Sequence, residues 1–237
     1  MKLRATGKAH VGLAFVLMCG LASESRAQTR SLSVRELAHI YESGGDTFGW
    51  DEFDVPEFVA ATYGGRARAA IVTILSEPST AENYYLQLEA LTTAQYARVG
   101  VPVETIIPYA RGAKGSSVGG VLRHRATMAL SMRADSTLQD FWLQVSRNPD
   151  PSFRQLAAAG LSCALGTAAL PHLSAMRTDE SPAVSRVADF YFREHTTKGQ
   201  EALACGGTVS RELSFTFPQT LRPELRARGE PILRRTP

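Results

Sequence analysis

The sequence predicts an all-α protein whose C-terminal half consists of short helical repeats. Three observations lead to this prediction. An apolar pattern returns every 31 residues, the apolar residues within each row follow the helical period, and a capping residue followed by proline stands at the row boundaries.

The 31-residue pattern is carried by two apolar stripes in each row. Ala126 recurs as Ala157 and Ala188, and it belongs to a stripe that starts at Leu122 and continues at i+4, i+7 and i+8. These spacings lie on one face of a helix. The second stripe consists of Leu138, Trp142 and Val145 in one row and of Ala169, Leu173 and Met176 in the next. Each row therefore predicts two amphipathic helices.

The row boundaries carry helix-start and helix-stop signals. Asp150-Pro151 and Ser181-Pro182 place a capping side chain before a proline, which loses no hydrogen bond at the first helical position. Residues 136–139 read Ser-Thr-Leu-Gln, a capping box that predicts the start of a second helix. Gly166 predicts the break between the two helices of the next row, and Pro171 lies close enough to the following helix start to be tolerated.

These rows resemble bacterial HEAT-like repeats, the kind of about 31 residues that also occurs in phycobilisome lyases. The resemblance covers about residues 120–195. The matching residues are Asp150, Pro151, Arg154, Ala157, Ala158, Leu161, Gly166, Leu173 and the turn from Asp179 to Pro182. It implies antiparallel helix pairs in a short right-handed solenoid that serves as a generic binding scaffold.

The repeats are expected over residues 116–207, with an atypical last row. After Phe192 the row loses its large apolar residues, which is typical of a shortened terminal cap. Residues 212–218 alternate like a short strand, and the remainder of 208–237 is rich in proline and arginine, which predicts an extended basic tail.

Residues 28–115 predict an irregular helical region. Helices are expected at 33–41, at 66–76 and after a cap at Thr80, but the 31-residue period is lost, so degenerate repeats remain an open alternative. Residues 44–54 contain four acidic and three aromatic side chains without the spacing of an EF-hand loop, so a turn with packed aromatic rings is favoured over a calcium site.

The first 27 residues have the composition of a bacterial secretory signal peptide. A basic start is followed by an apolar run at 11–22 and by small residues at Ser25 and Ala27, so the mature protein is expected in the periplasm or outside the cell. The full chain has 26 Lys+Arg and 23 Asp+Glu, and the leader holds four basic residues and one acidic residue, which leaves 22 of each. This balance argues against nucleic-acid binding. No later apolar run is long enough to predict a transmembrane segment.

Ser117 is the one candidate nucleophile in a recognisable pattern. Residues 115–119 fit G-x-S-x-G, but a nucleophile elbow must follow a buried strand, and the preceding Ala-Arg-Gly-Ala-Lys is not one. Lys114 also stands on the wrong side of Gly115 for a phosphate-binding P-loop. We therefore expect a joint at this position. A serine hydrolase using Ser117, or a lyase-like enzyme by analogy with the family, is the alternative.

The favoured function is binding of another protein. In a HEAT-like solenoid the second helices line the concave face, which would present Phe141, Gln144 and His172. Arg123 and Arg154 occupy equivalent positions and are expected to bridge adjacent rows through Asp150 and Asp179. Neither a cofactor nor a metal is expected.

Cys163 and Cys205 remain after the leader is removed, and an exported chain favours a disulfide between them. Regular stacking would place them on opposite edges, about 15 Å apart for helices of about 10 residues. A disulfide needs Cα atoms within about 7 Å. Either the disulfide is absent or the terminal row bends back, and the oxidising compartment favours the bond.

Overall fold

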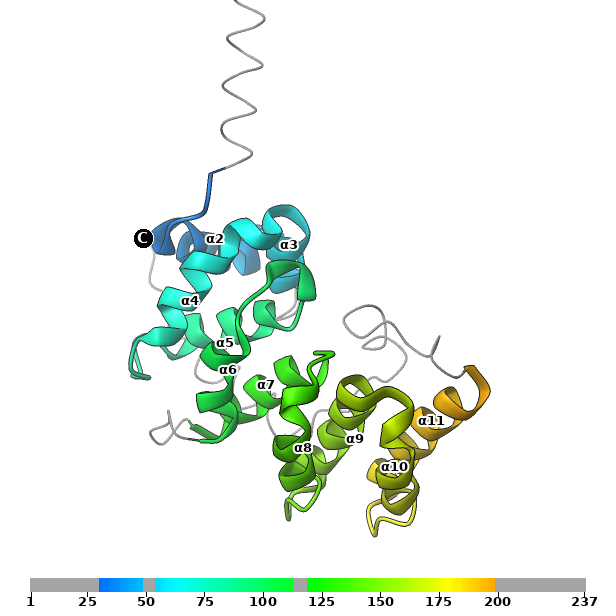
Figure 1. Ribbon diagram of the computed structural model, residues 1–237. Helices are drawn as coiled ribbons and strands as arrows, with labels where there is room; N and C mark the ends of the chain where they lie inside the picture. The colour runs from blue at the N-terminus through cyan, green and yellow to red at the C-terminus, as the bar shows by residue number, and fades with distance from the viewer. Residues whose placement is uncertain (1–29, 49–53, 113–118, 199–237) are drawn as a thin grey trace, which may run out of the picture.

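The computed structural model describes residues 30–48, 54–112 and 119–198, and every regular element within these ranges is a helix (Figure 1). The predicted all-α class is confirmed for this part of the chain. The helices pack as pairs, which is compatible with a helical repeat fold.

The first half is helical, with irregular element lengths. Its elements are α2 (Val34–Phe48), α3 (Asp54–Tyr63), η1 (Gly64–Ala67), α4 (Arg68–Ser76), α5 (Tyr84–Ala94), η2 (Ala97–Val99) and α6 (Val103–Ala110). At the start of α2, Ser33 Oγ accepts a hydrogen bond from the Glu36 N–H at 3.3 Å, and the Glu36 carboxylate accepts one from the Ser33 N–H at 2.9 Å. This reciprocal capping box starts the helix. Because α2 runs to Phe48, residues 44–48 are helical and do not form the predicted turn.

The second half follows the predicted 31-residue period. Its elements are α7 (Gly119–Ser131), η3 (Ser136–Leu138), α8 (Gln139–Val145), α9 (Pro151–Leu165), η4 (Gly166–Ala169), α10 (Leu170–Met176) and α11 (Pro182–Lys198). The helices α8 and α10 begin 31 residues apart, and so do α9 and α11. The repeat read from the sequence is therefore a repeat of helices.

Three of the predicted boundary signals can be compared with the structure. The Asp150 carboxylate accepts a hydrogen bond from the Ser152 N–H at 2.8 Å, and Pro151 begins α9, as predicted. Gly166 ends α9 with φ +56° and ψ −131°, a conformation that residues with a Cβ rarely adopt. The prediction of Ser136 as a cap was one residue late. Asp135 is the cap, because its carboxylate accepts from the Thr137 N–H at 3.0 Å.

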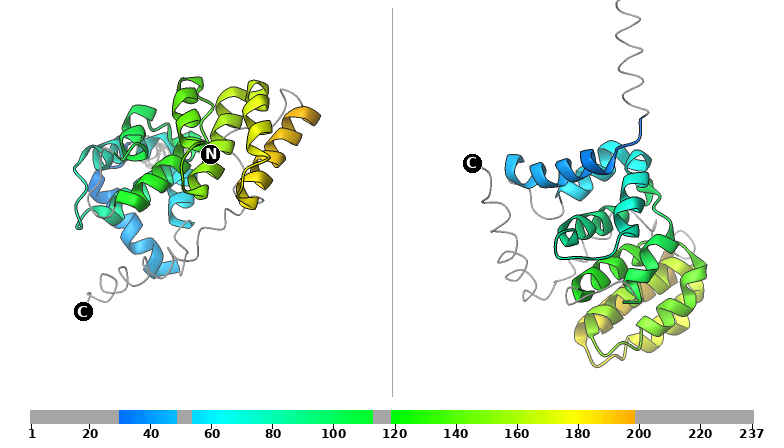
Figure 2. Two further views of the ribbon diagram at one scale, coloured as in Figure 1. Left: turned by 90° about the horizontal axis from the view of Figure 1, so that it is seen from below. Right: turned by 90° about the vertical axis from the view of Figure 1, so that its left-hand side faces the viewer.

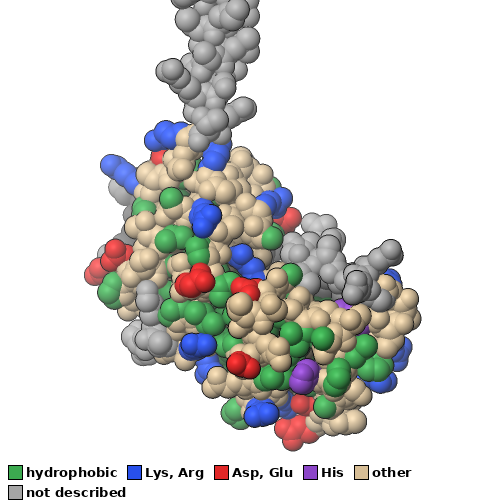
Figure 3. Space-filling model, in the orientation of Figure 1, with side chains coloured by type: hydrophobic (Ala, Val, Ile, Leu, Met, Phe, Trp, Pro, Cys, Tyr) green, Lys and Arg blue, Asp and Glu red, His purple; other side chains and the backbone are tan. Residues whose placement is uncertain are grey.

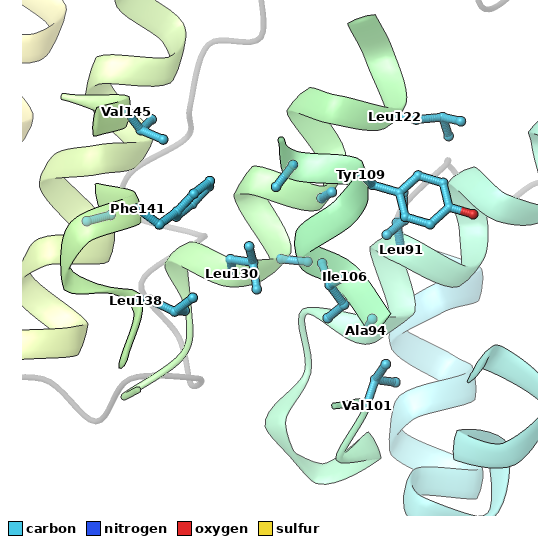
Figure 4. Close-up of a cluster of buried hydrophobic side chains, with 14 of the residues drawn as sticks. Leu91, Ala94, Val101, Ile106, Tyr109, Leu122, Leu130, Leu138, Phe141 and Val145 are labelled. Carbon is cyan, nitrogen blue, oxygen red and sulfur yellow. The ribbon is translucent and has the colours of Figure 1, made fainter. Parts of the chain in front are cut away.

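The helices are arranged as a row of packed neighbours. In this row α5 packs on α7, α7 on α9 and α9 on α11, while α6, α8 and α10 each pack on the helix that follows in the chain (Figures 1 and 2). The repeated alanines Ala126, Ala157 and Ala188 are completely buried. Their small side chains allow the backbones of α7, α9 and α11 to approach closely. The hydrophobic core continues from Leu91 on α5 to Phe141 on α8 without a break (Figure 4).

The C-terminal end of α4 is closed by side chains from two later helices. Gln87 of α5 is completely buried and donates from Nε2 to the carbonyl oxygens of Ile74 and Glu77 at 3.3 and 3.0 Å. Tyr109 of α6 donates from its hydroxyl to the Leu75 carbonyl at 2.9 Å. The last carbonyls of a helix lack partners within the helix, so these bonds satisfy groups that burial would otherwise leave unpaired.

Several predicted segments lie outside the described residues. They are the leader at 1–27, the loop at 113–118, residues 199–207 of the shortened cap, the strand at 212–218 and the basic tail up to 237. Within the described residues, the stretch Pro151–Met176 has the length and the apolar composition that would let a helix cross a membrane. Half of its most apolar segment is buried inside the protein. A core helix of a soluble protein passes the same test, so the prediction of no transmembrane segment stays a prediction.

Candidate functional site

The structure separates the three residues predicted for the binding face. Phe141 is only 5% exposed and packs edge-on against Trp142, with ring centroids 4.8 Å apart. It belongs to the core, between Leu138 at the end of η3 and Val145 on α8 (Figure 4). Gln144 is exposed and His172 is half-buried. Only these two therefore contribute to an accessible surface.

Equivalent positions of α8 and α10, 31 residues apart, are buried or exposed in the same way at two places. Trp142 and Leu173 are equivalent and completely buried, whereas Gln144 and its equivalent Ala175 are exposed. We call the accessible side of these two helices the second-helix face. It consists of Asp140, Leu143, Gln144, Pro171, His172 and Ala175, all exposed or half-buried.

The second-helix face mixes apolar and polar chemistry. Leu143 is half-buried, Pro171 and Ala175 are exposed, and the polar side chains of Gln144 and His172 accompany them. Figure 3 shows hydrophobic side chains gathered over the region of α6, α8 and α10. A face of this composition can bury apolar area and offers hydrogen-bonding groups that fix the orientation of a partner.

His124 lies between α7 and α9 and is not part of this face. Its ring packs edge-on against Phe153 with centroids 5.3 Å apart, and the guanidinium of Arg123 lies 4.7 Å from the centroid of the same Phe153 ring. Burial, and to a smaller extent the positive charge of Arg125, together lower the pKa of His124 to about 4, while Asp150 acts in the opposite direction. His124 is therefore neutral in the folded protein at neutral pH.

The neutral state of His124 makes folding stability depend on pH. Its folded pKa of about 4 lies below the usual value of 6.5, so the unfolded chain binds the proton first as the pH falls. The free energy of unfolding should therefore decrease between pH 7 and pH 4, by about 2 to 3 kcal/mol from this residue. Urea denaturation of wild type and His124→Gln at both pH values measures this. Equal pH dependence of the two proteins would contradict the assignment.

Arg154 forms the interaction between rows that was predicted for it. The side chain is 9% exposed and donates to both carboxylate oxygens of Asp179, from Nε and Nη2, at 2.8 Å each. Its Nη1 donates to the carbonyl oxygens of Asn148 and Pro149 at 3.0 Å. Arg123 also contacts the next row, but not through Asp150 as predicted: its guanidinium lies over the Phe153 ring, and it donates to the Ala110 carbonyl at 3.3 Å.

Ser162 and His195 form a pair that sequence reasoning missed. Ser162 Oγ and His195 Nε2 lie 2.7 Å apart, within reach for a nucleophile and its base. Their side chains are only 3% and 5% exposed, however, so a substrate has no access to them. The pair joins α9 to α11 inside the core. The signal in the sequence that could have found this pair is one polar residue near the end of the first helix in each of two successive rows.

The remaining candidates lie partly or wholly outside the described residues. Ser117 is one of them. Cys163 on α9 is disulfide-bonded, and because Cys205 is not among the described residues, the pairing of these two cysteines stays a prediction. In residues 30–48, 54–112 and 119–198 no group of three or more His, Cys, Asp or Glu side chains gathers as a metal site would require. No protein-family model, no curated protein and no solved structure matches this chain.

Proposed function

We propose that this protein is an exported HEAT-like repeat protein that binds another protein through its second-helix face. The proposal combines the secretory leader predicted at residues 1–27 with the helix pairs of the second half. Its place of action would be the periplasm or the exterior of a bacterial cell. The partner would present an apolar ridge flanked by hydrogen-bonding groups, to match Leu143, Pro171 and Gln144.

One observation supports the proposal most directly. Two core positions keep their apolar character in both rows, Trp142 with Leu173 and Val145 with Met176, while the exposed positions change completely. Asp140 becomes Pro171, and Gln144 becomes Ala175. A repeat scaffold has this division, because each row needs the same core to pack on its neighbours while its surface is free to suit a partner.

Charge placed on the second-helix face tests the proposal. The variant Gln144→Glu/His172→Glu/Ala175→Glu puts three carboxylates on exposed or half-buried positions, where folding should tolerate them. Chemical cross-linking in the native envelope, followed by affinity capture and mass spectrometry, would compare this variant with wild type. We expect cross-linked partners of the wild type to be lost from the variant, because a charged side chain pays desolvation without a counter-charge in the complex.

The control carries the same number of substitutions elsewhere, each of which reverses a charge. Glu57→Lys/Glu77→Lys/Glu82→Lys alters three exposed side chains of the first half. This variant should keep the wild-type partners. Recovery of the same partners by all three proteins would refute the second-helix face as the binding surface, and circular dichroism would verify that each variant is folded.

A further inference from the structure

An open polar pocket lies between α10 and α11, which pack on each other (Figure 1). Its volume is about 530 Å³, within the range of sites that hold small molecules. Every residue that lines it has a polar or charged side chain. We call the lining residues the α10–α11 pocket, and they are Ser174, Arg177, Thr178, Ser185, Arg186 and Asp189. Such a lining suits a ligand that is rich in hydrogen-bonding groups.

The packing of one helix pair on the next does not require the charges of this pocket. The equivalent positions between α8 and α9 lie 31 residues earlier in the chain. There the position of Arg177 holds Ser146. The position of Asp189 holds Ala158, which is completely buried. The charged groups therefore belong to this pocket alone and not to the repeated scaffold of the two rows.

Arg177 is held in a fixed orientation at the wall of the pocket. Its Nε lies 2.8 Å from Asp189 Oδ1, and its guanidinium carbon lies 4.5 Å from the centroid of the Phe192 ring. These two contacts use Nε and one face of the guanidinium, and the side chain is still 39% exposed. The edge between its two terminal nitrogens can hold a carboxylate or a phosphate through two parallel hydrogen bonds.

The pocket carries a surplus of positive charge. Asp189 pairs with Arg177 and also with Arg193, whose Nη2 lies 2.7 Å from Asp189 Oδ2. Arg186 is exposed and forms no ion pair with an acidic side chain in the described part of the chain. One carboxylate thus accompanies three guanidinium groups. The other acidic residues within 170–198 pair with different basic residues, and they are Asp179, Glu180 and Glu194. The two surplus charges favour an anionic group in the ligand.

Two hydroxyl groups of the pocket are arranged as acceptors. Ser185 Oγ donates to the Arg177 carbonyl oxygen at 2.7 Å, and Thr178 Oγ1 donates to the Ala175 carbonyl oxygen at 2.9 Å. A hydroxyl has one hydrogen to donate, so both oxygens have only lone pairs to offer a ligand. A ligand that uses them must supply donors, such as hydroxyl groups of its own.

We propose that the α10–α11 pocket binds a sugar that carries an acidic group. The acidic group, a carboxylate or a phosphate, lies against Arg177 and Arg186, and hydroxyls of the sugar donate to Thr178 and Ser185. An acidic peptide side chain has the anion without neighbouring hydroxyls, and a neutral sugar has the hydroxyls without the anion. An acidic sugar uses both kinds of group in the pocket. The pocket shares no residue with the second-helix face, so each of the two proposals can fail without the other.

Isothermal titration calorimetry with small probes tests the site. The full chain would be titrated at pH 7 with glucuronic acid, glucose 6-phosphate, glucose and cyclohexanecarboxylic acid. We expect at least one of the two acidic sugars to bind about tenfold more tightly than glucose, because hydrogen bonds to a charged group contribute at least that much. Cyclohexanecarboxylate has a six-membered ring and the charge without the hydroxyls, and it should bind several-fold more weakly. Comparison of the two acidic sugars shows whether carboxylate or phosphate is preferred.

Two variants assign the two kinds of group. Arg186→Gln should weaken binding of the acidic sugar about tenfold and leave the fold unchanged, because this side chain is exposed. Thr178→Val keeps the shape of the side chain and removes an acceptor. It should weaken binding of the acidic sugar several-fold and leave binding of cyclohexanecarboxylate as in wild type.

The control is Arg147→Gln, which changes an exposed arginine at the position equivalent to Thr178 in the preceding row. It should bind the acidic sugar as wild type does, and circular dichroism would verify that each variant is folded. The proposal is overturned if neither acidic sugar binds, if cyclohexanecarboxylate binds as tightly as the acidic sugars, or if Arg186→Gln binds as wild type does. It is also overturned if the control loses as much binding as Arg186→Gln, or if a peptide of three glutamates binds more tightly than both acidic sugars.

Discussion

Replacement of Arg154 by alanine is expected to lower the free energy of unfolding by about 3 to 5 kcal/mol. The substitution removes both hydrogen bonds to Asp179 and leaves that carboxylate, 13% exposed, without its counter-charge. It also leaves the carbonyl oxygens of Asn148 and Pro149 without this donor. Denaturant unfolding followed by circular dichroism measures the loss.

Two further variants separate the charge of Arg154 from its shape. Arg154→Lys keeps the charge but cannot form the two parallel bonds, so it should recover only a small part of the loss. Arg147→Ala, which changes an exposed arginine in the turn before α9, should change stability by less than about 0.5 kcal/mol. An Arg154→Ala protein as stable as Arg147→Ala would show that the ion pair contributes nothing.

The ion pair between Arg154 and Asp179 also makes the folding stability depend on pH. The hydrogen bonds from Arg154 lower the pKa of Asp179 below its ordinary value. The stabilisation is therefore present above the unfolded pKa of about 4 and is lost as the pH falls through the lower folded pKa. The difference in stability between wild type and Arg154→Ala should shrink over that range.

Replacement of Gly160 by alanine is the second change with a large expected effect. A Cβ at this position would lie 2.2 to 2.6 Å from three ring atoms of Trp142, which is completely buried. Alanine favours helix over glycine by about 1 kcal/mol, but an overpacked core costs about 1 to 3 kcal/mol and sometimes more. At contacts this short the overpacking dominates, so we expect a net loss of about 2 kcal/mol in denaturant unfolding.

A substitution of Trp142 tests this explanation. Trp142→Phe shortens the ring system and removes an indole N–H that is buried without a hydrogen-bond partner among the described residues. In the Trp142→Phe background, Gly160→Ala should cost less than about 1 kcal/mol, because the space that the Cβ needs has been vacated. If the cost of Gly160→Ala is the same in both backgrounds, contact with Trp142 is not its cause.

The sequence predicted the second half of the fold better than the first for a physical reason. In the second half, the signals that set the helix boundaries are local. Asp150-Pro151 starts α9 and Gly166 ends it, and both signals depend only on residues next to them in the chain. In the first half the decisive contacts join distant residues. Gln87 on α5 is completely buried because it bonds to α4, and no local pattern marks such a residue for the core.

The candidate site was predicted less well than the fold. Phe141 was assigned to a binding face although it lies three residues after Leu138 and four before Val145, spacings that place it beside the core stripe. The assignment followed from the repeat position alone. The equivalent residue in the next row, His172, is half-buried, whereas Phe141 is buried. The burial of His124 and the contact of Ser162 with His195 depend on how close α7, α9 and α11 lie, which spacing along the chain does not specify.

The closure of α4 by Gln87 and Tyr109 has a consequence for the order of folding. The donors that complete its last turn come from residues 10 to 34 positions later in the chain. This end of α4 therefore remains frayed until α5 and α6 have docked, however favourable the helix is locally. Residues 68–110 should thus form one cooperative folding unit, in which α4, the first helix along the chain, is the last to complete its hydrogen bonds.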